Sequence, residues 1–523
     1  MGLPILWLAG SALTSSTAGG GLAATMLPIS LRDTGLLMVS VGLLSATLGF
    51  LAAWAVSHYD FPGRGLFDWA LMLPLAIPTY IAAYCYTELL DFTGPAQQLV
   101  RYLTGGERTG DYWFPPIRSF GGGVVVLSLV LYPYVYAACR AFFLMQSGTT
   151  HAAARVLGAG GLRTLLGVTL PLSRPPLVVG ATLAMMEVVN DLGAVQYFGI
   201  NSLTAIIYST WINRSNFGGA AQLAVTIVLV IALLILAERG ARRASFATTA
   251  RDSRVAPART PLAGGRAALA TLGCGLLLLA AFGLPVGQLV YLVARQAGVA
   301  TLVMPWPAVG ATLTVAGIGA LVTTAIGYFA AHRGRSASRG ARAAIRVATL
   351  GYAIPGTVLA LGLLQPLGLF DRWLNGLTRW AFAWTPGLIL SGSIAALVYV
   401  YAIRFLAVSQ STLAEAMDKR GGSLLDAARV LGSRGLGLFL RVDLPTLSPA
   451  LLAAVTLVFV EIVKELPATL LLRPLGVETL ATQVYAQANA GLFVQAALPA
   501  LAIVLAGLIP VVLATQMSSR RKV

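Results

Sequence analysis

Charged residues are scarce in this chain of 523 residues: Asp, Glu, Lys and Arg make up 11% of it, and hydrophobic residues make up 57%. An ordinary soluble domain carries about 25% charged residues. The composition therefore excludes a soluble protein and predicts a membrane protein. Apolar stretches long enough to cross a bilayer, which takes about 20 residues, lie near 35–57, 68–90, 119–144, 177–198, 221–237, 267–293, 308–331, 345–367, 384–407, 449–472 and 496–515.

These stretches give eleven spans, and the first residues could supply a twelfth. The alternating ten-residue pattern of an outer-membrane barrel is missing from all of them. The predicted fold is therefore an all-α integral membrane protein.

Cysteine and histidine are also rare. The three cysteines lie in apolar surroundings and match no metal-binding spacing or disulfide framework, so we interpret them as small core residues: Cys85, Cys139 and Cys274. The three histidines lie at span edges or in loops, which argues against a metal path made of nitrogen or thiolate ligands: His58, His151 and His332.

Lysine occurs only at positions 419, 464 and 522, and none of the three follows a glycine. A P-loop requires Gly-Lys-Ser/Thr, so the chain is not predicted to hydrolyse ATP. The formal charge of +17 comes from arginines, which cluster at 239–266, 333–346 and the C-terminus. If the spans alternate, all three clusters lie on one side, which the positive-inside rule makes the cytoplasm. This placement explains the charge without nucleic-acid binding.

The chain repeats itself. AARVLG at 153–158 recurs at 427–432, and at the same offset Leu-Pro at 170–171 recurs at 444–445. Ile-Pro at 77–78 matches 354–355, Gly49 matches Gly327, and YVYA at 134–137 is matched to YVYA at 399–402. A fixed register over a long stretch predicts a tandem duplication. We predict a first repeat at 1–240, a basic cytoplasmic linker at 241–266 and a second repeat at 267–523, with both repeats in the same membrane orientation.

The beginning of the chain allows two interpretations. GLP at 2–4 resembles GLP at 283–285, late in the first span of the second repeat. Either Met1 falls in the middle of a span, or the first repeat has five spans.

The loops after the spans ending near 144 and 407 share the longest match. They read AARVLGAGGLRTLLGVTLPLSRP and AARVLGSRGLGLFLRVDLPTLSP. An Ala-rich helix, a Gly break, an apolar helix and a Pro before the next span suit a helix–turn–helix that inserts into a groove on a soluble partner. The alternative is a generic interfacial loop, which the second copy in the same register argues against.

These loops resemble the EAA loops of permease subunits of ABC importers. The resemblance implies a type I ABC-importer permease fold with about six helices per repeat. It also implies two copies of a separate ATPase subunit, which would bind ATP and Mg, while this chain binds no cofactor. The matching positions would contact the ATPase: Ala153, Ala154, Gly158, Leu170 and Pro171 in the first loop, and Asp426, Ala427, Ala428, Gly432, Leu444 and Pro445 in the second.

The first loop departs from the motif, because Ala152 stands where the family has an acid and the second loop keeps Asp426. An acid near a helix start contributes about 0.3–1 kcal/mol. The two contacts with the ATPase therefore need not be equivalent.

Several further stretches are similar to fused ferric-iron permeases of the Fbp type. They include LPLAIPTYIAAYCYTELL at 73–90, LYPYVYAACRAFF at 131–143 and KELPATLLLRP at 464–474. This resemblance implies transport of Fe³⁺ from a periplasmic binding protein across a bacterial inner membrane. Thiamine, a polyamine or another small solute is the alternative cargo.

Two pairs of acids stand inside apolar stretches: Glu187 with Asp191, and Glu461 with Glu465. A spacing of four places each pair on one helix face. Four ionised, unpaired acids would cost on the order of 10–14 kcal/mol at the bilayer centre, so we do not expect them to face lipid. Carboxylates suit a small hard cation, and we predict that the four acids line the translocation path, with Glu187 and Glu461 as candidate metal ligands.

Two other interpretations of the acids stay open. Lys464 is three residues from Glu461 and next to Glu465, so an ion pair within the helix is possible. A proton-coupled secondary transporter with parallel repeats would also place acids inside its spans. That protein would use the acids to relay protons rather than to pass a metal ion.

Overall fold

The computed structural model describes residues 2–14, 20–108, 110–146, 156–158, 160–245, 259–297, 304–336, 338–420, 428, 430–431 and 435–519. The chain is almost wholly helical in these ranges, and the two strands found there are a two-residue parallel pair, β1 (Tyr59–Asp60) and β2 (Thr260–Pro261). The described residues contain eight helices long and apolar enough to cross a membrane, or up to eleven if each of three bent pairs is one span. The predicted all-α membrane fold is confirmed.

The chain divides into two compact units, and each unit contains segments from both halves of the sequence. Unit 1 comprises Met1–Gly20, Thr210–Val225 and Val303–Ala486. Unit 2 comprises Gly21–Ser209, Thr226–Leu302 and Gln487–Val523. Helices near the ends of the chain are thus exchanged between the units. The predicted boundaries at 240 and 267 concern sequence repeats and stay a prediction.

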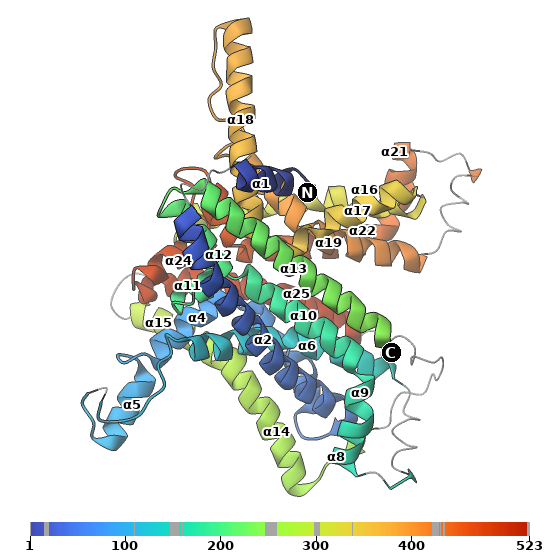
Figure 1. Cartoon of the computed structure of the whole chain (residues 1–523). Coiled ribbons are helices and arrows are strands. Elements are labelled where there is room, and N and C mark those ends of the chain that lie inside the picture. The colour runs from blue at the N-terminus through green and yellow to red at the C-terminus, as the bar shows by residue number, and fades with distance from the viewer. Residues whose placement is uncertain are drawn as a thin grey trace. The chain divides into compact units, whose positions relative to one another are not determined.

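Unit 2 holds most of the first half of the chain (Figure 1). Its α12 ends in unit 1, and its α13 begins there. The helices are α2 (Gly20–His58), α3 (Arg64–Ala70), η2 (Leu73–Ala76), α4 (Thr79–Leu90), α5 (Pro95–Thr104), α6 (Phe120–Met145), α8 (Gly161–Thr164), η3 (Leu165–Thr169), α9 (Leu170–Leu172), α10 (Arg174–Asn190), α11 (Gly193–Tyr197), α12 (Leu203–Ile212), α13 (Phe217–Ser245), α14 (Gly264–Leu278), η5 (Leu279–Gly283), α15 (Leu284–Ala297) and α25 (Phe493–Ser519).

Unit 1 holds most of the second half, with the first helix of the chain packed against it. Its α16, α19 and α22 lie against one another, and α1 lies against α18. The helices are α1 (Gly2–Thr14), α16 (Trp306–Ser336), α17 (Arg339–Thr349), η6 (Leu350–Ala353), α18 (Gly356–Phe382), α19 (Ile394–Arg420), α21 (Gly435–Leu438), η7 (Phe439–Asp443), α22 (Leu444–Lys464), α23 (Pro467–Leu472) and α24 (Leu480–Asn489).

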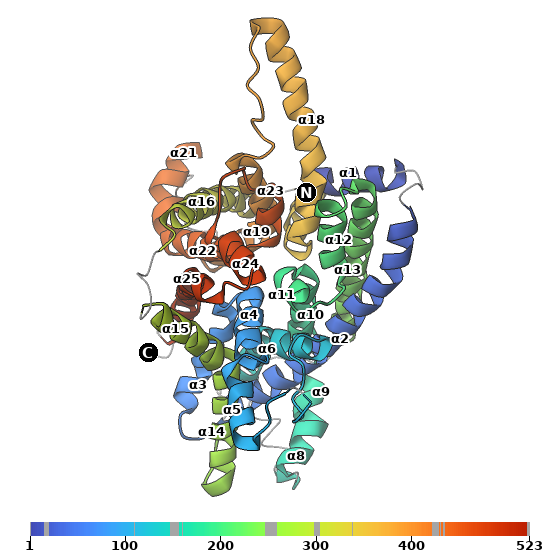
Figure 2. The ribbon, with the colours of Figure 1, turned by 90° about the vertical axis from the view of Figure 1, so that its left-hand side faces the viewer.

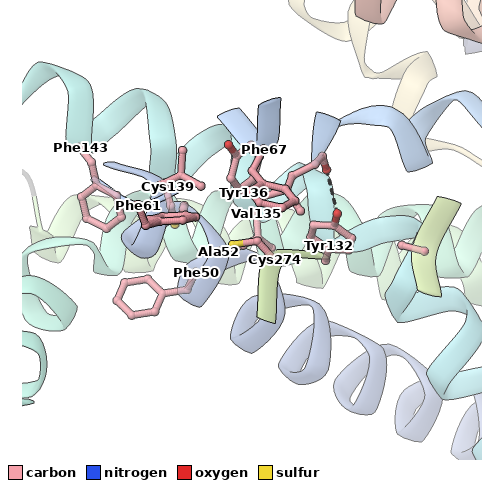
Figure 3. Close-up of a cluster of buried hydrophobic side chains, with 14 of the residues drawn as sticks. Phe50, Ala52, Phe61, Phe67, Tyr132, Val135, Tyr136, Cys139, Phe143 and Cys274 are labelled. Carbon is pink, nitrogen blue, oxygen red and sulfur yellow. Dashed lines mark hydrogen bonds between the residues drawn. The ribbon is translucent and has the colours of Figure 1, made fainter. Parts of the chain in front are cut away.

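Unit 2 contains a cluster of buried aromatic and small side chains between α2, α3, α6 and α14. Figure 3 shows Tyr132 and Tyr136 of α6 among these side chains, and Tyr132 donates a 2.9 Å hydrogen bond to the carbonyl of Leu71. Cys139 and Cys274 lie in the same cluster, and Cys85 is buried elsewhere in the unit. All three cysteines are free thiols and all three are buried, so the prediction that they are core residues is confirmed.

The duplication is visible as repeated local structure. The π-helical turns η3 and η7 occupy equivalent positions of the two loops, and each is followed by a Leu-Pro helix start. Thr34 accepts a hydrogen bond from the amide of Leu203, and Thr312 accepts one from Leu480, both at 2.8 Å. Each repeat therefore builds the same contacts independently.

Both repeats also break one helix at the Ile-Pro pair. Pro78 and Pro355 have nearly equal backbone angles, with ψ of 142° and 139°. The helical segments on either side are bent by 95° in the first repeat and by 113° in the second. A proline lacks the N–H that would continue the helix, so both repeats bend at the matched Ile-Pro pair.

The predicted match between YVYA at 134–137 and YVYA at 399–402 is wrong. Gly49 packs against Val135 and Tyr136, whereas Gly327 packs against Ser409 and Gln410. The structural counterpart of YVYA at 134–137 is therefore the stretch around 409, nine residues beyond the second YVYA. The two YVYA stretches therefore stand at positions that are not equivalent in the two repeats.

Candidate functional site

Each repeat carries a loop that ends in the π-turn and the Leu-Pro helix start. In the first loop Gly158 is exposed and has φ of 79°, the left-handed region that suits glycine. A side chain there would meet open space, so the backbone angle rather than crowding favours glycine. The predicted Gly break is thus present in the first loop.

Two aliphatic side chains just before the break are almost fully exposed. Val156 and Leu157 are 87% and 86% exposed, and their counterparts Val430 and Leu431 are 88% and 84% exposed. Exposed aliphatic pairs of this size are typical of protein contact sites when they recur at equivalent places. Each loop therefore exposes the same pair of aliphatic side chains.

The other predicted loop residues divide into three groups. Leu170 and Pro171 are half-buried where α9 begins, whereas Leu444 and Pro445 are exposed where α22 begins. Ala428 is buried. The remaining predicted contacts lie outside the described residues: Ala153, Ala154, Asp426, Ala427 and Gly432.

A buried charge network, which the sequence interpretation missed, holds the second loop. Asp443, the last residue of η7, is 1% exposed and lies 2.7 Å from Arg420 Nη1 at the end of α19. It also accepts a 2.6 Å hydrogen bond from Tyr328 Oη of α16, and His332 Nδ1 is 3.9 Å away. Arg420 Nη1 in addition donates to Thr446 Oγ1 of α22 at 2.8 Å. The network joins the loop to three long helices; we call it the Asp443 network.

The first repeat has no carboxylate at the equivalent position. Thr169 stands where the second repeat has Asp443, and it is buried and neutral. A half-buried ion pair of this repeat instead joins α6 to α3, with Arg140 making bonds of 2.7 and 2.8 Å to the two carboxylate oxygens of Asp68. The Asp443 network is therefore specific to the second loop, although the π-turn and the Leu-Pro helix start occur in both.

The acids at 191 and 465 are helix caps. Asp191 follows the last residue of α10, with ψ of 131°, and its Oδ1 accepts from the amides of Ala194 and Val195 at 2.9 and 3.1 Å. The hydroxyl of Thr79 donates to its other oxygen. A carboxylate that accepts the free amides at a helix start stabilises that helix, here α11.

Glu465 repeats this arrangement. It follows the last residue of α22, with ψ of 120°, and its carboxylate accepts from the amides of Ala468 and Thr469 at 3.2 Å. Arg404 Nε lies 3.8 Å from Oε1, and both side chains are at least nine-tenths buried. In both repeats the helix therefore ends before the second acid of the pair, and that acid caps the next short helix.

The acids at 187 and 461 lie within the helices and are half-buried. Glu461 Oε1 is 3.0 Å from Lys464 Nζ, which is the ion pair that the spacing allowed. The described residues contain no group of three or more His, Cys, Asp or Glu that could hold a metal ion. The path role of the four acids, and the metal role of Glu187 and Glu461, therefore stay predictions.

Sequence signals existed for part of what was missed. Arg404 stands inside an apolar stretch, where a buried partner is expected, and Asp443 replaces Thr169 in an otherwise closely matched loop. Pro467, at the first position of α23, is a helix-start signal directly after Glu465.

Comparisons with known proteins agree with this architecture. The family described as binding-protein-dependent transport system inner membrane component matches residues 45–244. The Fe(3+)-transport system permease protein FbpB 2 of Haemophilus influenzae is 24% identical over 92% of this chain and 88% of its own length.

Shorter relatives match only part of the chain. The molybdenum transport system permease protein ModB of Escherichia coli is 29% identical over 38% of this chain and 87% of its own length. The sulfate transport system permease protein CysT of Salmonella typhimurium is 24% identical over 37% of this chain and 68% of its own length.

These relatives are transport permeases and not catalytic enzymes, so ATP hydrolysis belongs to a separate ATPase subunit. The family also implies a binding protein that delivers the cargo. Together with the apolar helices and the repeated loops, the matches support a fused, multi-span inner-membrane permease subunit of an ABC importer that resembles Fbp-type permeases.

Proposed function

We propose that this permease carries ferric iron, delivered by a periplasmic binding protein, across the inner membrane. The observation that carries the proposal is the likeness to a ferric-iron permease over 92% of the chain, through both repeats. The molybdate and sulfate permeases match little more than a third of the chain. The ferric-iron permease is matched through both repeats, whereas these two relatives are matched over 209 and 199 residues.

The acids fit a cationic cargo. Glu187 and Glu461 are half-buried in apolar helices at equivalent places of the two repeats. Hard cations such as Fe³⁺ favour carboxylate oxygens over nitrogen and sulfur. In this proposal the two glutamates stabilise the passing ion, while Asp191 and Glu465 keep the neighbouring helix breaks in shape through their caps.

Two copies of the ATPase would engage the two loops, with ATP and Mg bound on those subunits. The support is the exposed Val-Leu pair that each loop carries at the same position. This arrangement places the loops, the linker and the C-terminus in the cytoplasm, in agreement with their arginines. Closure of the ATPase pair on ATP would then pull on both loops.

The test is uptake by the reconstituted complex of permease, ATPase and cognate binding protein in proteoliposomes. Radioactive ferric iron, molybdate, sulfate, thiamine and a polyamine are offered in turn, each loaded on the binding protein. We expect ATP-dependent uptake of iron alone. Uptake of an oxyanion, thiamine or a polyamine in place of iron would contradict the cargo assignment.

The same vesicles test the transport class. With an ATPase variant that binds but does not hydrolyse ATP, iron uptake should stop whether or not a proton gradient is present. Uptake that persists with this ATPase and collapses with the gradient would instead indicate a proton-coupled transporter.

A further inference from the structure

The outer half of α18 and the chain that follows it form a hairpin that projects from unit 1. We define the α18 hairpin as residues 369–393. The helix ends at Phe382, Ala383 reverses the chain with φ of 50°, and an extended segment returns to the start of α19 at Ile394. Figures 1 and 2 show this orange hairpin extending away from α16, α19 and α22 of the same unit.

The hairpin has a defined structure. Asp371 is fully buried and accepts hydrogen bonds from the amides of Ile389, Leu390 and Ser391 at 3.2, 2.9 and 2.7 Å. The side-chain amide of Asn375 donates to the carbonyl of Gly387 at 2.7 Å and accepts from its amide at 2.9 Å. These five bonds fasten the returning segment to the helix, so the exposed side chains are held in place.

The surface of the hairpin is unusually apolar for an exposed element. Trp380 is 86% exposed and Phe382 is 78% exposed. Burying large apolar side chains is favourable, so a surface of this kind is expected to be covered. The exposed large apolar residues are Leu369, Phe370, Trp373, Leu377, Trp380, Phe382, Trp384, Leu388 and Ile389.

The direction of α18 indicates that a membrane covers this surface. The segment α17–η6 and α18 meet at a bend of 113°. Figures 1 and 2 show α18 running across the common direction of α16, α19 and α22, which lie against one another and are long and apolar enough to cross the membrane. A helix that crosses them in this way runs along the bilayer rather than out of it. The exposed face of the hairpin is then in contact with lipid.

The depth follows from α19, which has 27 residues and is therefore about 40 Å long. Its last residue, Arg420, belongs to the Asp443 network at the coupling loop. Its first residue, Ile394, joins the hairpin and therefore lies beyond the hydrocarbon core of about 30 Å, at the opposite membrane surface. The hairpin thus meets the headgroup layer on the side away from the ATPase.

The charge pattern favours lipid headgroups. Arg372 and Arg379 are exposed, and the hairpin's one acid, Asp371, is buried and bonded to the backbone. An exposed surface of tryptophan, leucine and arginine without free acids complements anionic phosphates with acyl chains beneath them.

The first repeat has a comparable element in unit 2. There α5 is the last helix of the bent pair of that repeat, and it exposes Leu99, Tyr102 and Leu103 at 59%, 85% and 72%. The apolar element after the broken helix is thus a property of both repeats.

We propose that the α18 hairpin is a lipid-binding element that lies in the outer headgroup layer of the membrane and binds anionic phospholipid through Arg372 and Arg379. It fixes the outer end of α19, and through that helix it supports the second loop.

The test is the depth of a spin label in the complete transporter, reconstituted in nanodiscs that contain phosphatidylglycerol. Trp380→Cys carries the label, and Leu475→Cys, fully exposed in the loop between α23 and α24, is the matched control. Cys85, Cys139 and Cys274 are buried and are replaced by Ala in both. We expect the ratio of oxygen to nickel-chelate accessibility to be several-fold higher at 380 than at 475.

Equal and high nickel accessibility at both positions would overturn the proposal. Protection of position 380 that appears only when the binding protein is added would also overturn it, because the hairpin would then be a protein-docking surface.

A second variant tests the charge. In Arg372→Gln/Arg379→Gln the label should become shallower, and its depth should no longer respond to replacing phosphatidylglycerol by phosphatidylcholine. The matched control is Arg473→Gln, whose guanidinium is paired with Glu478 in the same unit at 3.0 Å. Unchanged depth in the double variant, or an equal change in the control, would contradict lipid binding by these arginines.

Discussion

The Asp443 network gives the sharpest prediction for the second coupling loop. In Asp443→Asn the carboxylate is replaced by a neutral amide of the same shape, and the Arg420 charge, 91% buried, loses its counter-charge. Removing one partner of a buried ion pair costs about 3–5 kcal/mol. The amide can still accept the Tyr328 hydroxyl, so the loss falls mainly on the ion pair. We expect η7 and the first turn of α22 to open locally far more often.

Hydrogen exchange measured by mass spectrometry detects this opening. A change of about 1.4 kcal/mol in the free energy of opening changes the opening equilibrium tenfold. A loss of about 3 kcal/mol should therefore speed exchange in residues 435–446 by on the order of 100-fold. The peptide 161–172 of the first loop is an internal control, because Thr169 replaces Asp443 there. Its exchange should not change.

The double variant Arg420→Met/Asp443→Leu separates the charge from the packing. Replacing a buried ion pair by apolar side chains of similar volume is often neutral or stabilising, so protection should return toward that of the unmodified protein. The explanation is refuted if Asp443→Asn leaves exchange at 435–446 unchanged. It is also refuted if the double variant exchanges faster than the single one.

Three further predictions concern the loops and the acids. Gly158→Arg/Gly432→Arg should release the ATPase during purification in detergent, since a side chain at φ of 79° costs about 1–2 kcal/mol and a bulky cation obstructs the apolar contact; undiminished co-purification would contradict docking by the loops. Glu187→Gln/Glu461→Gln should lower iron uptake at least tenfold with little change in expression, and uptake at the unmodified level would remove both acids from the path. Asp191→Ala should cost about 0.5–2 kcal/mol through loss of the cap on α11, seen as a lower midpoint of thermal unfolding, and an unchanged midpoint would show that the cap is unimportant.

The spans and the duplication could be predicted because apolar length and self-similarity are direct sequence signals. The 113° bend also falls at a matched proline, Pro355, where the backbone hydrogen bond must break. These features depend on local chemistry, so they can be predicted without knowledge of tertiary contacts.

The acids show where sequence reasoning ends. The spacing of four residues predicts a helix that continues through Asp191, whereas the helix stops at Asn190. The stop becomes favourable because Asp191 finds the amides of α11 and the hydroxyl of Thr79, which is 112 residues away in the sequence. Partners so distant in sequence leave no periodic pattern. The pairing of Asp443 with Arg420 and Tyr328 was missed for the same reason.

The exchange of helices between the two compact units has a consequence for how the protein is made. Unit 1 needs Met1–Gly20 and also residues up to Ala486, while unit 2 is complete only with Gln487–Val523. Neither unit can close when the ribosome has finished the first repeat, so that repeat must wait in the membrane for helices that emerge later. A nick in the linker after synthesis would leave each unit still composed of both fragments, and the two pieces should stay together.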